Sequence, residues 1–406
     1  MQTVTSPSET RIVELRGGLG TVPGVRMAGV HAGIKKRKRD LALIAFDSPQ
    51  VCAAVTTTNE IKAAPVLVSN EHLTAFGDNM RVVVCNSGCA NACTGERGER
   101  DARATARQAA ALLELDPHQV IVASTGVIGV PLAMDRMSKG IEHAVEQLEN
   151  GNKAAFDAAE AIMTTDRVPK LSAYAFYVDG KKYVVGGIAK GSGMIAPNMA
   201  TMLAFVATDY PQTRAALQSA LSGACEETFN MISVDGDMST NDAVYAFAPQ
   251  GKSNGCDAFS EAFRRVCHDL AIAMVADGEG ATKTLAVTVS GARSTQQARN
   301  IARAIINSNL VKTAIFGEDP NWGRIIAAAG SAREGLDPDA WQIEINGKLW
   351  VDKGAIEVLS EAEAHFELEE RKIDIVLNLG IGDAQATGWG CDLSRDYVRI
   401  NASYRT

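Results

Sequence analysis

Residues 186–209, GGIAKGSGMIAPNMATMLAFVATD, join two apolar segments through a run of small residues. The segments Lys182–Ile188 and Met202–Thr208 are both predicted to be β-strands, because β-branched and apolar residues dominate them. Glycines in the run between them permit a close backbone approach or a positive φ. Thr201 stands where the second strand begins, so its hydroxyl is a candidate nucleophile. The alternative, from these residues alone, is an ordinary long connection between strands.

A second candidate feature is the turn that follows the predicted strand Gln119–Ser124. Thr125 and Gly126 come directly after this strand, where backbone N–H groups lose their strand partners. Such groups, with a hydroxyl beside them, can stabilise an oxyanion. The alternative interpretation is a plain turn between a strand and a helix.

Composition limits the possible functions. The chain has 406 residues and a formal net charge of -8, which argues against a nucleic-acid-binding role. The short basic run Lys35–Arg39 is interpreted as a solvated loop. There is no run of about eighteen apolar residues, so we expect no membrane span. The first residues lack a basic-then-apolar signal, and a cytoplasmic location is expected.

Eight cysteines are sparse for this length, so a disulfide framework is not expected. Cys85, Cys89 and Cys93 recur every four residues, a spacing that lines one face of a helix. The sequence therefore predicts a helix that begins near Asn86 and carries buried thiols. A metal site would need other spacings and nearby histidines.

A calcium loop is the other metal site to consider. Asp235, Asp237 and Ser239 occupy alternate positions, as calcium ligands do. The loop lacks the glycine and the glutamate that an EF-hand needs at its sixth and twelfth positions. We expect no bound metal.

The rest of the chain alternates helical and strand patterns, which favours a layered α/β sandwich. A hairpin is expected at Asn346-Gly347, a helix cap at Ser294 and a glycine-rich loop over Gly380–Asp392. Predicted helices are Asp101–Leu115, Pro131–Asn150, Asn152–Thr164, Gln212–Ile232, Asp257–Asp277 and Ser294–Asn307. Further predicted strands are Leu41–Phe46, Cys52–Thr57, Arg81–Cys85, Leu285–Ser290, Val311–Phe316, Ile373–Leu379 and Tyr397–Ile400.

The residues around Thr201 resemble the self-cleavage segment of the ornithine acetyltransferase family, also called the glutamate N-acetyltransferase or ArgJ family. The matching run is KGSGMI, at 190–195, continued by APNMATML, at 196–203. Further matches are STG at 124–126, MTTD at 163–166, SVDGD and STND within 233–242, GEG at 278–280 and the tail at 401–406. Many relatives have threonine directly after the MTTD motif, where this chain has Arg167.

The resemblance implies an α/β/β/α sandwich of the self-processed, N-terminal-nucleophile-like kind. It implies cleavage between Ala200 and Thr201. The products would be an α chain, 1–200, with the oxyanion hole, and a β chain, 201–406, that begins with the nucleophile. The two chains would form one intertwined unit and assemble into a heterotetramer of two α and two β chains.

The resemblance also implies an activity. The acetyl group of N²-acetylornithine would move to glutamate through acetyl-Thr201, in a ping-pong reaction of cyclic arginine biosynthesis. Some family members also use acetyl-CoA as donor, and no other cofactor is expected. The implied oxyanion hole is Thr125 and Gly126. The implied substrate contacts are Thr164, Lys190, Thr201, Glu279, Asn401 and Thr406.

A threonine hydroxyl needs a base, and the α-amine of an N-terminal threonine can serve. That amine titrates near about 7.7–8.0, close to working pH. Cleavage before Thr201 would therefore create the base. The rival class is an N-terminal-nucleophile aminopeptidase or amidase, with water as acceptor. A binding or scaffold protein would show neither cleavage nor transfer.

Overall fold

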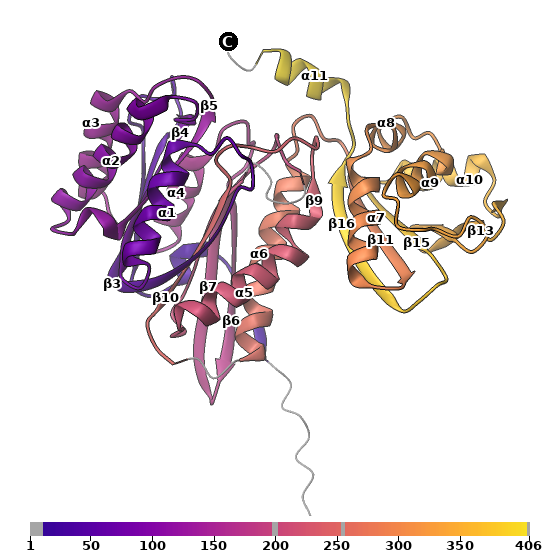
Figure 1. Ribbon diagram of the computed structural model, residues 1–406, viewed down its shortest axis with the longest axis horizontal. Coiled ribbons are helices and arrows are strands. Elements are labelled where there is room, and N and C mark those ends of the chain that lie inside the picture. Colours follow the sequence, from indigo (N-terminus) through magenta and orange to yellow (C-terminus); the bar gives the residue numbers. More distant parts are fainter. Residues whose placement is uncertain (1–10, 197–201, 253–255, 404–406) are drawn as a thin grey trace, which may run out of the picture.

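The computed structural model describes residues 11–196, 202–252 and 256–403. These residues form two lobes, one around a nine-stranded sheet and the other around a seven-stranded sheet (Figure 1). The predicted site residues Ala200, Thr201 and Thr406 lie outside the described part.

The first sheet has the strand order β1-β6-β7-β8-β10-β3-β4-β5, and β2 pairs with β3. The pairs β8–β10 and β4–β5 are parallel. The strands are β1 (Ile12–Leu15), β2 (Val25–Val30), β3 (Leu41–Thr56), β4 (Met80–Cys89), β5 (Val120–Val127), β6 (Lys170–Val178), β7 (Lys181–Lys190), β8 (Leu203–Thr208) and β10 (Ala243–Pro249). The helices of this lobe are α1 (Ala64–Phe76), α2 (Gly95–Leu112), α3 (Met134–Glu146), α4 (Asn152–Ile162), α5 (Arg214–Glu227) and α6 (Asp257–Ala276).

The long strand β3 divides this sheet into two halves. Its residues 41–46 pair with β2, whereas its residues 50–56 pair with β10. The three residues between them, 47–49, are exposed. The strand thus passes from one half of the sheet to the other.

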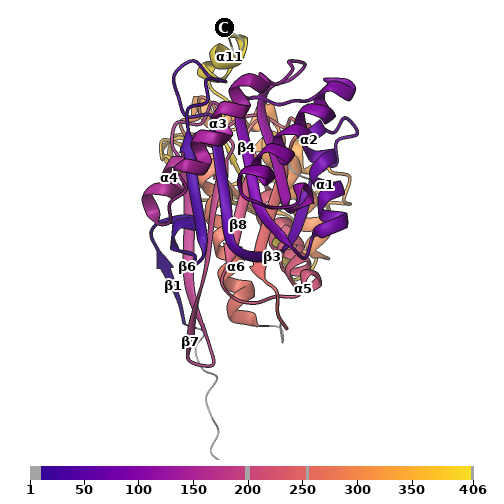
Figure 2. The same ribbon diagram turned by 90° about the vertical axis from the view of Figure 1, so that its left-hand side faces the viewer.

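Alternation along the strands shows that the two halves face each other. Val83 on β4 and Phe205 on β8 enter one shared central core. Val82 faces a separate core with α2 and α3, and Val206 faces another with α5 and α6. Figure 2 shows α1, α2 and α3 in front of the strands. The layers are helix, sheet, sheet and helix, so the predicted α/β/β/α sandwich is confirmed.

Helix α4 closes one side of the central core. Ala155, Ala158 and Ala159 are fully buried there. The small side chains let α4 approach β2 so closely that a Cβ on Gly29 would lie 1.9 Å from the carbonyl oxygen of Asp157. Alanine on the helix and glycine on the strand therefore allow this contact.

The second lobe has the strand order β14-β13-β12-β15-β11-β16-β9, and α7 packs on β16 and β11. The hairpin at Asn346-Gly347 is confirmed by the pairing of β12 with β13. Ser294 caps α7 as expected, since its hydroxyl accepts from Gln297 N at 3.1 Å. The elements are β9 (Ile232–Ser233), β11 (Thr284–Ala292), β12 (Gln342–Ile345), β13 (Lys348–Asp352), β14 (Ile356–Glu357), β15 (Lys372–Asn378), β16 (Ala384–Cys391), α7 (Thr295–Asn307), α8 (Asn309–Gly317), α9 (Trp322–Ser331), α10 (Glu361–Leu368) and α11 (Arg395–Ala402).

The predicted helix from Asn86 is wrong. Strand β4 continues through Cys89, because it pairs with β5 over this whole stretch. The next helix, α2, begins only at Gly95. The four-residue spacing of the cysteines therefore does not indicate a helix. Pairing with a strand that is distant in the sequence determines the local structure.

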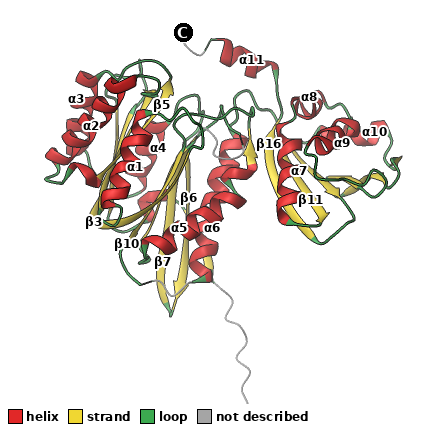
Figure 3. Cartoon of the chain, viewed as in Figure 1, coloured by secondary structure: helices red, strands yellow, loops and turns green. Residues whose placement is uncertain are grey.

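Three predictions near the C-terminus are also wrong (Figure 3). Residues 311–316 form part of α8, where Val311, Ala314 and Ile315 are buried at helical spacing. Residues 384–391 form β16 in place of a loop. Residues 397–400 belong to α11, which is capped by Ser394 and buries none of its side chains. Short apolar runs such as those at 311–316 and 397–400 fit a strand and a helix equally well.

Among the described residues, no helix is long and apolar enough to cross a membrane.

Candidate active site

Thr125 and Gly126 lie inside β5, because the strand continues its pairing with β4 through Val127, and the prediction that they form a turn after the strand is wrong. Thr125 is buried and Gly126 has a φ of 131°. A Cβ on Gly126 would lie 2.4 Å from the carbonyl carbon of Gly88, so this position accepts only glycine. Both predicted residues line a cavity of about 250 Å³.

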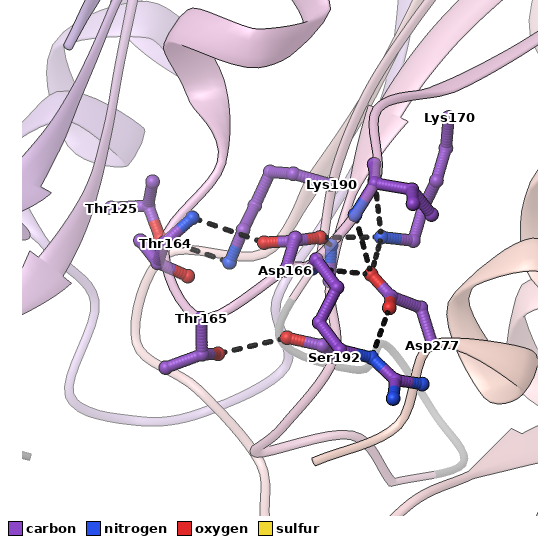
Figure 4. A network of polar contacts seen from close by, with 11 residues as sticks. Thr125, Thr164, Thr165, Asp166, Lys170, Lys190, Ser192 and Asp277 are labelled. Carbon is purple, nitrogen blue, oxygen red and sulfur yellow. Dashed lines mark hydrogen bonds and ion pairs between the residues drawn. The ribbon is translucent and has the colours of Figure 1, made fainter. Parts of the chain in front are cut away.

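The side chain of Lys190 lies beside Thr125. It is the last residue of β7 and is 2% exposed. Its ammonium donates a hydrogen bond to Thr125 Oγ1 at 3.3 Å (Figure 4). Burial lowers the pKa of Lys190, and the carboxylate of Asp166 opposes that shift.

A network of buried charged side chains lies next to Lys190. Asp166 accepts hydrogen bonds from Lys170 Nζ at 2.7 Å and from Gly191 N at 2.7 Å. Lys170 also contacts Asp277 at 2.7 Å, and all three side chains are buried (Figure 4). Burial raises the pKa of Asp166, but the charges of Lys190 and Lys170 outweigh it and lower that pKa to about 2.

Arg167, where the chain departs from the family pattern, belongs to this network. Its backbone N–H and its Nε donate to Asp277 at 2.9 and 3.0 Å. The side chain is 62% exposed. Thr164 lines the cavity although Arg167 differs from the family pattern, and the N–H of Thr164 donates to Asp166 at 3.0 Å. Arg167 therefore does not displace Thr164 from the cavity wall.

Glu279 supplies a negative charge to the cavity wall. It is 8% exposed, and its Oε2 accepts from Asn401 Nδ2 at 2.7 Å. Its N–H donates to Ser192 O at 2.7 Å. A Cβ on Gly193 would lie 2.4 Å from the Glu279 carboxyl carbon, so glycine makes room for this side chain.

The structure brings together six residues predicted as site residues and leaves three outside its described part. The cavity is lined by Ala90, Thr125, Gly126, Val127, Ile128, Thr164, Thr165, Lys190, Gly193, Met194, Ser239, Asn241, Glu279 and Asn401. Those that lie outside the described residues are Ala200, Thr201 and Thr406. The cavity thus holds one lysine and one glutamate, charges suited to an amino acid.

Comparison with known proteins decides the family. The profile of the ArgJ family matches residues 26–406. This chain belongs to the ArgJ family. An arginine biosynthesis bifunctional protein ArgJ from Caldanaerobacter subterraneus subsp. tengcongensis is 46% identical, over 97% of this chain and 99% of its own length. The protein of that name from Symbiobacterium thermophilum is 47% identical, again over 97% and 99%.

Among solved structures, a crystal structure of ArgJ from Bacillus halodurans aligns at 40% identity and a TM-score of 0.46. The alignment covers 48% of this chain and 100% of that chain.

Sequence reasoning missed several residues that hold the site of this ArgJ-family chain together. Lys170 and Asp277 meet although 107 positions separate them. Asn241 donates to the carbonyls of Ala90 and Ser124 at 2.7 and 2.8 Å, which holds β5 in place just before Thr125. No local pattern marks such partners. Ser239 and Asn241, in the STND motif, also line the cavity.

The metal expectation remains a prediction. Among the described residues, no group of three or more histidine, cysteine, aspartate or glutamate side chains could hold an ion. Asp235 instead accepts from the N–H groups of Met194 and Ile195, at 2.6 and 2.8 Å.

Proposed function

We propose that this protein is an acetyltransferase of arginine biosynthesis that moves the acetyl group of N²-acetylornithine to glutamate. Membership of the ArgJ family supports the pathway. The observation that carries the substrate class is that Lys190 and Glu279 line one cavity together with Thr125 and Gly126. In this proposal, Lys190 attracts the carboxylate of an amino acid and Glu279 attracts its ammonium group.

The oxyanion is stabilised by the side chain of Thr125 and the backbone N–H of Gly126. A lysine ammonium can only donate hydrogen bonds. Since Lys190 donates to Thr125 Oγ1, the hydroxyl hydrogen of Thr125 remains to be donated. The buried lysine also strengthens that donor by its charge. A hole of this kind serves acetylation and deacetylation of the nucleophile alike.

The nucleophile in this proposal is Thr201, freed by self-cleavage at Ala200–Thr201. Its hydroxyl attacks the preceding carbonyl, and water opens the ester that results. The new α-amine then acts as base for the same hydroxyl. N²-acetylornithine acylates Thr201 and ornithine leaves before glutamate takes the acetyl group, which makes the reaction ping-pong.

We infer that the α chain, 1–200, and the β chain, 201–406, remain one unit. Strand β7 lies in the α chain and pairs with β8 of the β chain at 185–190 and 203–208. Strand β10 of the β chain pairs with β3 of the α chain. Separating the two chains would expose the apolar cores on both faces of these strands. We further propose a tetramer of two α and two β chains, a cytoplasmic location, Thr406 as a substrate contact, and acetyl-CoA as a second acetyl donor without any bound cofactor.

The test is the mass and N-terminal sequence of the purified protein beside Thr201→Ala. We expect two fragments, the second beginning at Thr201, and an uncut variant. Labelled acetyl from N²-acetylornithine should then appear on glutamate. Release of free acetate at the same rate with and without glutamate would instead identify an amidase. A wild-type chain that folds but is not cleaved would refute the assignment of Thr201 as the nucleophile.

A further inference from the structure

A second concave region lies between the two lobes, outside the cavity described above. Helix α6 of the first lobe packs against β16 of the second lobe (Figure 1). A cleft of about 450 Å³ lies beside Ala276, the last residue of α6. A smaller cavity of about 210 Å³ adjoins this cleft, because Thr284 and Lys372 line both. Ligands often bind at such boundaries between structural units, and none of the lining residues is a proposed substrate contact.

Basic residues dominate the wall of the larger cleft. It is lined by Arg167, Lys283, Arg371 and Lys372, and by none of the described acidic residues. The whole chain carries a formal net charge of -8, so this positive charge is a local concentration. A concave surface with one sign of charge attracts ligands of the opposite sign. We call this region the cationic cleft.

Much of the positive charge in the cationic cleft is available to a ligand. Arg371 and Lys372 are exposed, and neither side chain forms an ion pair within the described part of the chain. Arg167 donates from Nε to Asp277, and its side chain is 62% exposed, which leaves its two terminal nitrogens for a ligand. Guanidinium groups pair with phosphate oxygens through two parallel hydrogen bonds, and lysine adds a point charge. The cleft therefore suits a ligand with phosphate groups.

The backbone of the cleft is fixed in advance. Asp392 accepts hydrogen bonds from the N–H groups of Thr282 and Lys283 at 2.8 and 2.9 Å. The Nζ of Lys283 donates to Glu318 Oε1 at 2.6 Å, so this lysine is already paired. Both carboxylates are thus engaged with the wall itself. A preformed site loses little conformational freedom when a ligand binds.

The smaller cavity offers an apolar and aromatic surface. Trp389 lines it together with Ile272 and Val275 of α6. The ring of Trp389 meets the ring of His268 edge-on, with 5.1 Å between the ring centroids. Asp374 is exposed and lines the same cavity, where it can accept from amino or hydroxyl groups. The bases of nucleotides stack on aromatic side chains, so this cavity, the Trp389 cavity, suits a base.

We propose that the cationic cleft and the Trp389 cavity together bind a nucleotide. The phosphate groups lie against Arg167, Arg371 and Lys372, and the base contacts Trp389. The nucleotide is either free or the end of a larger molecule; CoA, for example, carries an adenosine diphosphate unit. The inference concerns binding alone and does not depend on the proposed transfer reaction.

Two chain segments connect the proposed site with the active cavity. Thr165 and Glu279 line the active cavity. Arg167 and Ala281, each two residues further along the chain, line the cationic cleft. The site is therefore a neighbour of the active cavity, and a larger molecule held by its phosphates extends from the one toward the other.

The test is isothermal titration calorimetry of the full-length protein with ADP, inorganic pyrophosphate and CoA. Arg371→Gln combined with Lys372→Gln removes two cations of the cleft. Arg293→Gln combined with Lys353→Gln is the matched control, because both residues are exposed in the same lobe and line neither the cleft nor the Trp389 cavity. Both double variants should keep the wild-type melting temperature, since neither breaks an ion pair of the described residues.

We expect ADP to bind at one site per chain, and pyrophosphate to bind about tenfold more weakly because it lacks the base. The cleft double variant should bind ADP about 100-fold more weakly, whereas the control should match wild type. Trp389→Leu should weaken ADP about tenfold and leave pyrophosphate unchanged, whereas general damage to the fold would weaken both. Tighter binding of CoA than of ADP assigns the site to the end of a larger molecule, and equal binding assigns it to a free nucleotide.

Three results would overturn the proposal. The first is that neither ADP nor CoA binds, and the second is that both bind the cleft double variant as tightly as wild type. The third is pyrophosphate binding as tight as that of ADP, which would leave a site for inorganic anions only. If Trp389→Leu does not fold, the comparison of ADP with pyrophosphate on wild type still decides whether the base contributes. Calorimetry needs neither cleavage nor turnover, so a chain that is never cut would fail the proposed function and still test this site.

Discussion

Lys190 shows how the surroundings of one side chain set its chemistry. A buried lysine tends to lose its proton, because the charged form is poorly solvated. Here Asp166 lies close enough to oppose that shift. Asp166 is in turn held ionised by two lysines and by the N–H groups of Thr164 and Gly191. The carboxylate of Asp166 therefore favours the charged form of the donor beside Thr125, against the effect of burial.

Replacing Lys190 by methionine should remove the hydrogen bond that the ammonium group donates to Thr125 Oγ1. Loss of an oxyanion donor typically lowers kcat by about 10²–10³, and we expect a fall in acetyl transfer of that order. Lys182→Met is the matched control, since Lys182 is exposed on the same strand. Steady-state kinetics with both substrates measure the effect. Wild-type kcat/KM in K190M would show that the ammonium is not needed.

Asp166→Asn should destabilise the fold in a pH-dependent way. The carboxyl pKa is lowered to about 2 in the folded state, against about 3.9 in an unfolded chain. Its contribution is therefore complete above about pH 4 and is lost as the pH falls toward 2. Removing one partner of a buried ion pair costs about 3–5 kcal/mol. Urea unfolding at pH 7 should show that loss, and the difference from wild type should shrink at pH 3. Asp179→Asn, in an exposed turn, is the control.

At the scale of elements, the sequence predicts best where a pattern and a motif agree. Strands β5, β7 and β8 lie where the apolar runs place them, and the motif residues Thr125, Gly126 and Lys190 of β5 and β7 meet in one cavity. The end of strand β4, from Asn86 to Cys89, and helix α8 were predicted wrongly, because pairing with β5 and capping by Ser308 outweigh local composition. The ion pair of Lys170 with Asp277 joins segments that only the finished fold brings together.

Strand β5 should tolerate no side chain at Gly126. In Gly126→Ala the new Cβ would meet the backbone of Gly88 at 2.4 Å. We expect a loss of transfer activity and a lower melting temperature, because β5 must shift away from β4. Gly129→Ala is the matched control: Gly129 has a φ of 81° and open space around it. Equal effects of the two substitutions would show that only the positive φ matters.

Helix α11 should behave as a weakly held wall of the cavity. It buries no side chain, and Tyr397 Oη donates to Asp235 at 3.1 Å. Tyr397→Phe removes this hydrogen bond, which at about 1.4 kcal/mol corresponds to a tenfold change. We expect KM to rise by about that factor with kcat unchanged, because Asn401 on α11 bonds Glu279. Tyr177→Phe is the control, and an unchanged KM in Y397F would contradict this role.

At the scale of the whole molecule, the site lies where the two lobes meet. The first sheet supplies Thr125 and Lys190, the turn after α6 supplies Glu279, and α11 supplies Asn401. Figure 1 shows α11 above both lobes, after the last strand of the second sheet. The motif resemblance predicted which residues gather, whereas the division into two lobes was not predicted.

The cleaved protein should elute as one species under native conditions. Strand pairs β7–β8 and β3–β10 both join residues before 200 to residues after 201. Native gel filtration and denaturing electrophoresis of the same sample measure this: we expect one peak and two bands. Two native peaks would show that the strand pairs do not hold the chains together.

Strand β8 has a consequence for recovery after denaturation. It lies between β7 and β10 in the middle of the first sheet. An uncut chain inserts this strand in a unimolecular reaction. Once the chain is cut, denaturation yields two fragments, and the return of activity depends on their concentration and competes with aggregation. The working lifetime of the mature enzyme is then determined by how fast the cleaved protein unfolds. It is not determined by an equilibrium between folded and unfolded chains, because only the uncut precursor folds as a single chain.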